Sequence, residues 1–416
     1  MQQSKILMRA DSAKAGSATA FIRKGIGARL AQEMAMRILA VFISLTIMAL
    51  PVLAARRVSI KQFEQGFTGT RSKSDAEQAR WIFDFELTER VSAAMLTRWS
   101  ETAAGDQSRR ALIALVDSAA FQNLPQEEVP KTSALDGNGQ QKVLALATAY
   151  IDSTLSKLPN FFATETVSTF ADSPSFRDGA SFTSYEPMHY KKSWNVTVLY
   201  RSGKEVMETK RGREVLDQDQ TASAAVGLLS TGEFGPVLHT VLSDAQGGKL
   251  TWSHWETLGT STIAVFHFAV PEGKSHYKVK VLIPGHGTPF QVQPAYHGEI
   301  GIDPATGTIL RLTLRADMSA DDPLAQADLM VEYGPVEIGA KTYICPVKSV
   351  ARVMAPQLIS PIGRVMERGN ELGNSSKEDV YLQTVVNDIA FGHYQVLRSE
   401  AKILTGADLE DNPEKP

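Results

Sequence analysis

The sequence predicts an α+β fold in which an N-terminal helical region precedes a curved, half-barrel-like antiparallel β-sheet with a helix on its concave face. Three observations lead to this prediction. Apolar residues recur with helical spacing over residues 74–158 and alternate from Phe161 onward, as expected where helices give way to strands. One apolar helix, at residues 230–248, interrupts the strands. A clear β-hairpin follows at residues 296–316.

The hairpin at residues 296–316 shows the strand pattern most clearly. Alternation places these residues of its first strand on one face: Tyr296, Gly298, Ile300 and Ile302. Pro304 presets a type I turn, and Gly307 can take the positive φ that closes a bulged hairpin. The return strand is expected to bury its leucines on one face and to leave Arg311, Thr313 and Arg315 on a solvated face.

Composition limits the classes of protein to consider. The chain has 416 residues, of which 43% are hydrophobic, so it is long enough for two or three packed domains. Its formal net charge of −3 gives no overall electrostatic case for nucleic acid, which usually needs a clustered basic surface, and we therefore expect no nucleic-acid partner. Cys345 is the single cysteine, which rules out an intrachain disulfide.

Residues 36–54 have the pattern of a secretory signal peptide. Basic Arg37 precedes an apolar run at residues 38–50, and small residues precede a predicted cleavage near Ala54. The run is shorter than the roughly 20 apolar residues that a membrane-spanning helix needs. We therefore expect an exported protein, periplasmic or associated with the cell envelope, whose mature chain starts near Ala55.

The segment before Met36 is polar, basic and rich in Ala and Ser, which is unusual ahead of a signal peptide. We interpret residues 1–35 as a spurious N-terminal extension; an unusually long basic region or an uncleaved anchor is the alternative. The chain is accordingly divided into four parts: residues 1–54, the extension and signal peptide; 55–158, the helical region; 159–406, the β-rich domain; and 407–416, a flexible tail.

Three helices are predicted in the helical region, at about residues 74–100, 107–121 and 141–158. The first carries an apolar stripe that runs from Trp81 to Trp99. Such a stripe is typical of a packing face, but it is also wider than one short helix needs. It therefore suggests a second possibility, a surface that binds another protein.

Catalytic motifs are not found in the sequence. Five histidines, at positions 254, 267, 276, 286 and 297, lie within one span of strands, but their spacing forms no metal-binding pattern. Residues 284–287 (PGHG) occur without the HxHxDH cluster of metallo-β-lactamase-fold hydrolases, which favours a turn. Neither a G-x-S-x-G elbow nor a phosphate-binding loop occurs. We therefore expect no enzyme activity, no cofactor and no bound metal.

The shape of the sheet is then the main guide to function. A long antiparallel sheet with one apolar face and a short apolar helix can enclose a hydrophobic hollow. It can equally well form a filled layer, because alternation does not distinguish the two. The residues expected to line such a hollow are Phe234, Leu238, Val241, Phe266, Phe268, Val279, Val281, Ile300, Leu310, Leu312 and Leu314.

The order of these segments resembles the outer-membrane lipoprotein-sorting (LolA-like) superfamily. The resemblance rests on the signal peptide, the helix STGEFGPVLHTVLSDA and the hairpin YHGEIGIDPATGTILRLTLRA, and it spans about residues 161–404. It implies a half-barrel sheet whose concave face is covered by helices and binds acyl chains. The segments DFELTERVSAA, KLPNFFATET and VNDIAFGHYQVLRSEAKI also resemble a group of exported acidobacterial proteins, which implies no particular activity.

These features lead to two functional hypotheses. The first is a non-catalytic carrier or sensor of hydrophobic ligands in the cell envelope, whose partner is a lipid or an acylated protein. The alternative is an envelope scaffold or stress-signalling module that binds another envelope protein through its helical region.

Overall fold

A computed structural model describes residues 55–154, 157–177, 181–208, 227–228, 232–282, 290–358 and 380–397. All of them belong to one compact unit, Ala54–Pro416. The predicted signal peptide and C-terminal tail lie outside the described residues. Among the described helices, none is both long enough and apolar enough to cross a membrane.

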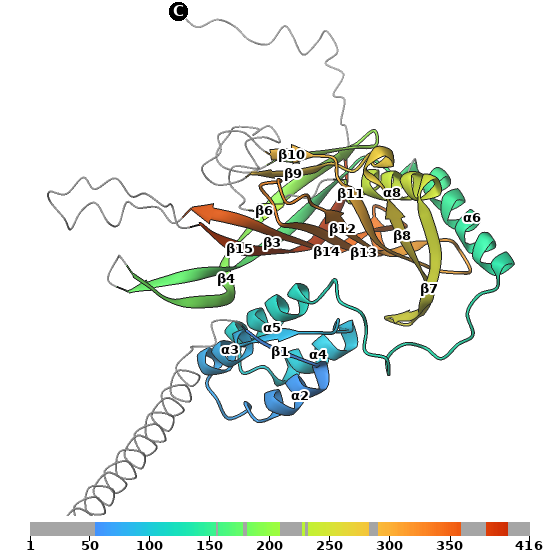
Figure 1. Ribbon diagram of the computed structural model, residues 1–416. Coiled ribbons are helices and arrows are strands. Elements are labelled where there is room, and N and C mark those ends of the chain that lie inside the picture. The colour runs from blue at the N-terminus through green and yellow to red at the C-terminus, as the bar shows by residue number, and fades with distance from the viewer. Residues whose placement is uncertain are drawn as a thin grey trace, which may run out of the picture. The chain divides into compact units, whose positions relative to one another are not determined.

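The first part of the described chain is a group of short helices (Figure 1). Its elements are β1 (Arg56–Val58), α2 (Ile60–Thr68), α3 (Asp75–Phe83), β2 (Phe85–Leu87), α4 (Ala93–Thr102) and α5 (Asp106–Ser118). The side chains of Ser59 and Ser74 cap the N-termini of α2 and α3, and each closes a capping box with the residue three positions later. These local caps define where the first two helices begin.

The single helix predicted at residues 74–100 is wrong. The chain leaves α3 at Phe83, forms β2 and begins α4 only at Ala93. The cause is a non-local pairing: β2 pairs in parallel with β1, and the Arg56 backbone N–H donates to the carbonyl of Asp84 at 2.8 Å. Tertiary pairing thus overrides the helical periodicity of this segment.

The aromatic stripe of this segment packs inside the helical group. Phe63 lies at its centre, with ring centroids 4.9 Å from Trp99, 5.5 Å from Trp81 and 5.8 Å from Phe85. The indole N–H of Trp99 donates to Glu64 at 2.9 Å. The stripe therefore forms the core of this group of helices.

The rest of the chain is built on a ten-stranded antiparallel sheet, which confirms the predicted α+β fold (Figure 1). The strand order is β5-β4-β3-β15-β14-β13-β12-β11-β8-β7. The strands are β3 (Phe161–Arg177), β4 (Ser181–Arg201), β5 (Lys204–Glu208), β7 (Lys249–Leu258), β8 (Ser261–Val270), β11 (Ala295–Ile302), β12 (Ile309–Asp317), β13 (Gln326–Ile338), β14 (Lys341–Leu358) and β15 (Val380–Val396). A smaller sheet has the order β10-β9-β6, from β6 (Gly227–Leu228), β9 (Val279–Leu282) and β10 (Phe290–Val292).

Two helices cover the apolar face of the large sheet. They are α6 (Gly137–Thr154) and α8 (Pro236–Gly247). Both contribute to one large buried cluster with the sheet, α6 through Val143, Ala147 and Ile151. The helix predicted at residues 141–158 therefore packs with the sheet and not with the aromatic core of the earlier helices.

The predicted hairpin is β11 and β12, and its register pairs Ile300 with Leu312. Gly307 has φ = 76°, which confirms the predicted left-handed turn position. The expected solvated face is wrong at Arg311 and Thr313, which are only 2% and 9% exposed. The reason is that the helical group covers this face of the sheet. Charged side chains connect the two.

Three groups of charged side chains join the helical group to the sheet. Arg90, from the segment between β2 and α4, donates two hydrogen bonds to Glu256 of β7. Lys348 of β14 lies 2.8 Å from Asp117 of α5. Arg352 of β14 donates to the backbone carbonyl of Ser118 at the end of α5. The helical group is thus held by polar contacts together with a small apolar cluster, in which Ala120, just after α5, packs against Met330 and Val350 of the sheet.

Candidate functional site

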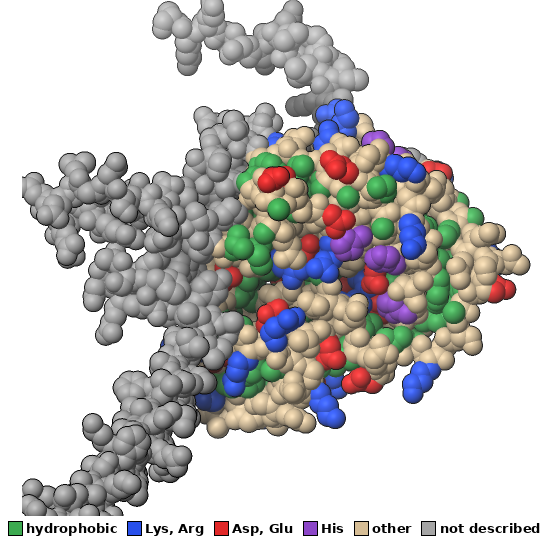
Figure 2. Space-filling view, in the orientation of Figure 1, with side chains coloured by type: hydrophobic (Ala, Val, Ile, Leu, Met, Phe, Trp, Pro, Cys, Tyr) green, Lys and Arg blue, Asp and Glu red, His purple; other side chains and the backbone are tan. Residues whose placement is uncertain are grey.

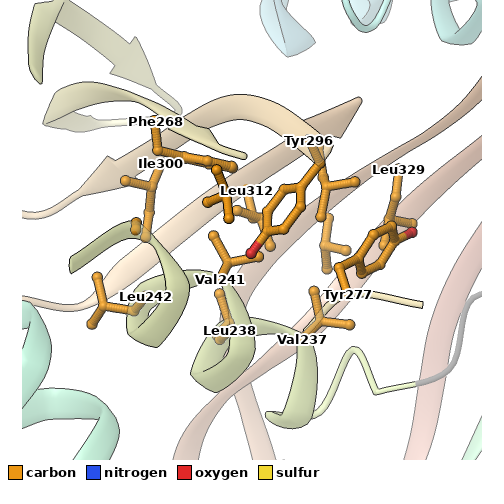
Figure 3. Close-up of a cluster of buried hydrophobic side chains, with 14 of the residues drawn as sticks. Val237, Leu238, Val241, Leu242, Phe268, Tyr277, Tyr296, Ile300, Leu312 and Leu329 are labelled. Carbon is orange, nitrogen blue, oxygen red and sulfur yellow. The ribbon is translucent and has the colours of Figure 1, made fainter. Parts of the chain in front are cut away.

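The residues predicted to line a hydrophobic hollow lie mainly in one buried cluster between α8 and the sheet (Figure 3). Nine of them share it: Leu238, Val241, Phe266, Phe268, Val279, Val281, Ile300, Leu312 and Leu314. Their exposed fractions range from 0% to 3%. In Figure 3 the side chains of α8 and of the sheet point toward one another. In this conformation they pack together as a core.

The other two predicted residues lie elsewhere. Phe234 belongs to a second cluster, where its ring is 5.3 Å from Phe161 and 5.5 Å from Phe391. Leu310 is partly exposed, because the register shifts between Gly301 and Ile302 and leaves it without a partner across the hairpin. Sequence alternation alone does not reveal such a bulge.

A buried carboxylate fixes α8 to the sheet. Asp244, on the apolar side of α8, is 4% exposed and accepts a 2.8 Å hydrogen bond from the Tyr296 hydroxyl of β11. It also accepts one from the backbone N–H of His276 at 2.8 Å, and its other oxygen lies 2.6 Å from the His276 ring nitrogen Nδ1. Because a buried carboxylate is costly unless it is hydrogen-bonded, these donors hold α8 in one position.

A second polar group holds the chain just before α8. The carboxylate of Glu205 accepts from the backbone N–H groups of Gly232 at 2.6 Å and Phe234 at 2.9 Å. Burial, together with the nearby charge of Glu233, raises the pKa of Glu205 to about 8. Burial also raises the pKa of Glu165 well above its usual range. Three carboxyl groups are therefore gathered where the chain enters α8.

Glycines mark both ends of α8. Gly232 has φ = 103°, a conformation that L side chains rarely adopt. Gly248 follows the last turn, and a side chain there would overlap the backbone carbonyl of Ala269 on β8. The helix is therefore attached through flexible residue types at each end, with Asp244 as its polar anchor to the sheet.

The histidines noted in the sequence do not form a metal site within the described part of the chain, where no group of three acidic, histidine or cysteine side chains could hold a metal. His254 contacts the Ser253 hydroxyl at 2.9 Å, and His297 pairs with Asp317 at 2.8 Å. Cys345 is buried, which raises the pKa of its thiol to about 12. His286 and the PGHG segment lie outside the described residues.

Sequence reasoning missed the polar residues of this site. Asp244 and Tyr296 are far apart in the chain, and no local pattern pairs a carboxylate on a helix with a tyrosine on a strand. The only sequence signal is a charged residue on the otherwise apolar side of α8. Comparisons with protein-family models, curated proteins and solved structures found no match to this chain.

Proposed function

We propose that this protein is an exported, non-catalytic carrier or sensor of a hydrophobic ligand with an acyl chain, acting in the cell envelope. The observation that supports it best is the construction of α8. This helix covers the apolar face of a large antiparallel sheet, has glycines at both ends and is anchored by one buried carboxylate. Such a helix can leave the sheet as a unit and expose an apolar surface to a ligand.

An acyl chain would take the place of α8 against the sheet. The apolar side chains of Phe268, Ile300 and Leu312 would then contact the ligand in place of Leu238 and Val241. Burial contributes about 0.8 kcal/mol for each methylene removed from water, so roughly ten buried methylenes supply roughly 8 kcal/mol. Opening costs the hydrogen bonds at Asp244 and also exposes the buried apolar side chains of α8, so the ligand has to cover apolar surface on α8 as well as on the sheet.

The test is binding of a fluorescent fatty acid to the full chain, together with native mass spectrometry of the protein purified without detergent. We expect saturable binding and an associated acyl species. Asp244→Asn weakens the anchor and should increase the apparent affinity several-fold, because less free energy is spent on opening α8. Leu312→Glu should abolish binding.

Two controls make the result decisive. Glu337→Gln changes a carboxylate that is exposed on β13, and it should leave binding unchanged. Circular dichroism verifies that each variant is folded. The proposal is wrong if the wild-type protein and the Asp244→Asn variant both bind no fatty acid and carry no acyl species.

The alternative function, protein binding through the helical region, lacks a supporting observation of this kind. Its basis was the stripe from Trp81 to Trp99, and those aromatic side chains pack against Phe63 and each other.

A further inference from the structure

The three carboxyl groups at the entry to α8 lie inside the protein. Figure 2 shows acidic and basic side chains spread over the visible surface of the molecule. In contrast, Glu165 of β3 and Glu233, just before α8, are only 4% and 1% exposed, and Glu205 of β5 is half-buried. Carboxyl groups that share a poorly hydrated space cannot all ionise without a large cost in free energy. The cluster therefore holds protons that water-exposed carboxyls release well below neutral pH.

Backbone hydrogen bonds tie this cluster to the chain that leads into α8. Both oxygens of the Glu205 carboxyl accept, one from the backbone N–H of Gly232 at 2.6 Å and one from that of Phe234 at 2.9 Å. Gly232 has φ = 103°, a conformation that glycine adopts freely. Residues 232–235, which we call the latch, therefore join the start of α8 to β5.

The ring of Phe234 closes the latch over the sheet. It is 1% exposed, and its centroid lies 5.3 Å from that of Phe161 and 5.5 Å from that of Phe391. Phe161 lies on the same face of β3 as Glu165, and Phe391 pairs with Glu165 across the two strands. Because the ring covers this face, removal of the latch admits water to Glu165 as well as to Glu205.

Opening of the latch therefore releases protons. Burial raises the pKa of Glu205 to about 8, with a further contribution from Glu233, and it raises the pKa of Glu165 well above its usual range. In water a glutamate titrates near about pH 4.3. The closed latch thus binds protons that the open latch gives up to solvent between about pH 5 and about pH 8, so a rise in pH favours the open form.

The phenol and thiol groups around the cluster stay neutral in this range. Burial raises their pKa values, which are already above neutral pH in water. They come from β4, from the segment before β9, and from β13, β14 and β15: Tyr200, Tyr277, Tyr333, Cys345 and Tyr394. Another titratable contact of α8 is His276, whose ring nitrogen lies 2.6 Å from Asp244 near the opposite end of the helix.

We propose that the latch is a pH-sensitive switch, which holds the start of α8 on the sheet at acidic pH and opens progressively as the pH rises through neutrality. Ionised Glu165 and Glu205 repel each other, and they regain hydration when residues 232–235 leave the sheet. This opening is the one that acyl-chain binding needs, so the switch rests on the proposed function for its biological use. The movement itself requires no ligand.

Hydrogen–deuterium exchange of the ligand-free full chain measures the opening directly. After correction for the intrinsic effect of pH on amide exchange, the protection of an amide gives its opening constant. We expect the amides of α8 to be at least about tenfold less protected than those of β12, because α8 opens without unfolding of the sheet. Between about pH 5.5 and about pH 7.5 the opening constant of α8 should rise at least about tenfold, since each released proton contributes about tenfold per pH unit.

Two variants assign the effect to the cluster. Glu165→Gln keeps both hydrogen bonds of the latch and should reduce the dependence of α8 opening on pH, and the double variant Glu165→Gln/Glu205→Gln should lose it. The matched control Glu337→Gln changes an exposed carboxyl of β13 and should keep the dependence. His276→Gln removes the other titratable contact of α8 and should also keep it. Circular dichroism verifies folding, and Glu165→Gln alone carries the test if the double variant does not fold.

The proposal is overturned if the opening constant of α8 in the wild-type protein does not change with pH, or if α8 is as strongly protected as β12 at every pH. A pH dependence that a folded Glu165→Gln variant retains in full, or that only His276→Gln removes, would also overturn it. A pH-dependent opening in a protein that binds no fatty acid would support the switch and refute the acyl-chain proposal.

Discussion

Arg311 and Glu256 form a two-point ion pair that is almost completely removed from solvent, with side-chain exposures of 2% and 3%. Nη2 of Arg311 donates to Oε2 of Glu256 at 2.7 Å, and Nη1 donates to the other oxygen. Arg90 reaches the same carboxylate from the helical group. One buried carboxylate thus joins two strands of the sheet and the helices that cover it.

Replacement of Arg311 should therefore be strongly destabilising. Arg311→Met leaves Glu256 with only one cation, and breaking a buried pair costs about 3–5 kcal/mol. Chemical denaturation should show this loss in the free energy of unfolding. Arg315→Met, on the same strand but 42% exposed, should cost less than about 1 kcal/mol. Similar losses in the two variants would contradict the importance of burial.

Tyr296→Phe tests the anchor of α8 without changing its shape. The variant removes one donor to the buried carboxylate of Asp244 and should lower the free energy of unfolding by about 1–3 kcal/mol. If α8 opens to admit an acyl chain, the same variant should also accelerate association of a fluorescent fatty acid in stopped-flow measurements. Tyr343→Phe, at a half-buried position on β14, serves as the control. An unchanged association rate in Tyr296→Phe would argue against opening at this anchor.

Stability should fall as the pH rises from about 5 to about 8.5. The pKa of Glu205 is raised to about 8 and that of Glu165 is raised well above its usual range, so the folded state binds more protons than the unfolded state in this interval. The stabilisation is complete below the pKa that these carboxyls have in the unfolded chain. It is lost as the pH rises through the pKa that they have in the folded protein. Because one pKa unit corresponds to about 1.4 kcal/mol, a loss of at least ~1 kcal/mol is expected.

Thermal unfolding across this pH range measures the effect. Other titratable groups that face these carboxyls are Glu233, Tyr200, Tyr333, Tyr394 and Cys345. Glu165→Gln should flatten the dependence on pH, whereas Glu337→Gln should not. A melting temperature that rises with pH in the wild-type protein would contradict the raised pKa values of Glu205 and Glu165.

Gly307→Ala should disrupt the contact between the β11–β12 turn and α6. A side chain at Gly307 would overlap the backbone carbonyl of Leu146, and the residue has φ = 76°. Gly203 has nearly the same φ, 77°, but its surroundings are open. Gly203→Ala should therefore show only the backbone strain of about 1–2 kcal/mol, and Gly307→Ala clearly more. Equal losses in the free energy of unfolding of the two variants, measured by chemical denaturation, would exclude the steric contact between residue 307 and Leu146.

The sequence predicted those parts of the fold that depend on neighbouring residues. The turn at Gly307, the two strands of its hairpin and the helix that starts at Pro236 all follow from alternation, helical spacing and the properties of Gly and Pro. Most predicted lining residues share one cluster for the same reason, since alternation identifies the apolar face. The bulge at Leu310 breaks that alternation locally.

What the sequence did not predict depends on contacts between distant segments. β2 replaces part of an expected helix because β1 pairs with it. Arg311 is buried because Arg90 and α5 cover a face that alternation marks as solvated. The burial of Asp244 is explained only by Tyr296, whose hydroxyl group donates a hydrogen bond to it. No local pattern contains these pairings, which tertiary packing alone creates.

The position of β15 in the sheet has a consequence for how the protein folds. This strand is the last described one, yet it lies between β3 and β14 and pairs Ile389 with Val167. Until β15 is available, β3, β4 and β5 are separated from the six strands that run from β14 to β7. Pairing between such distant segments makes folding slow and leaves strand edges exposed meanwhile. The sheet can therefore become continuous only after β15, residues 380–396, has been synthesised.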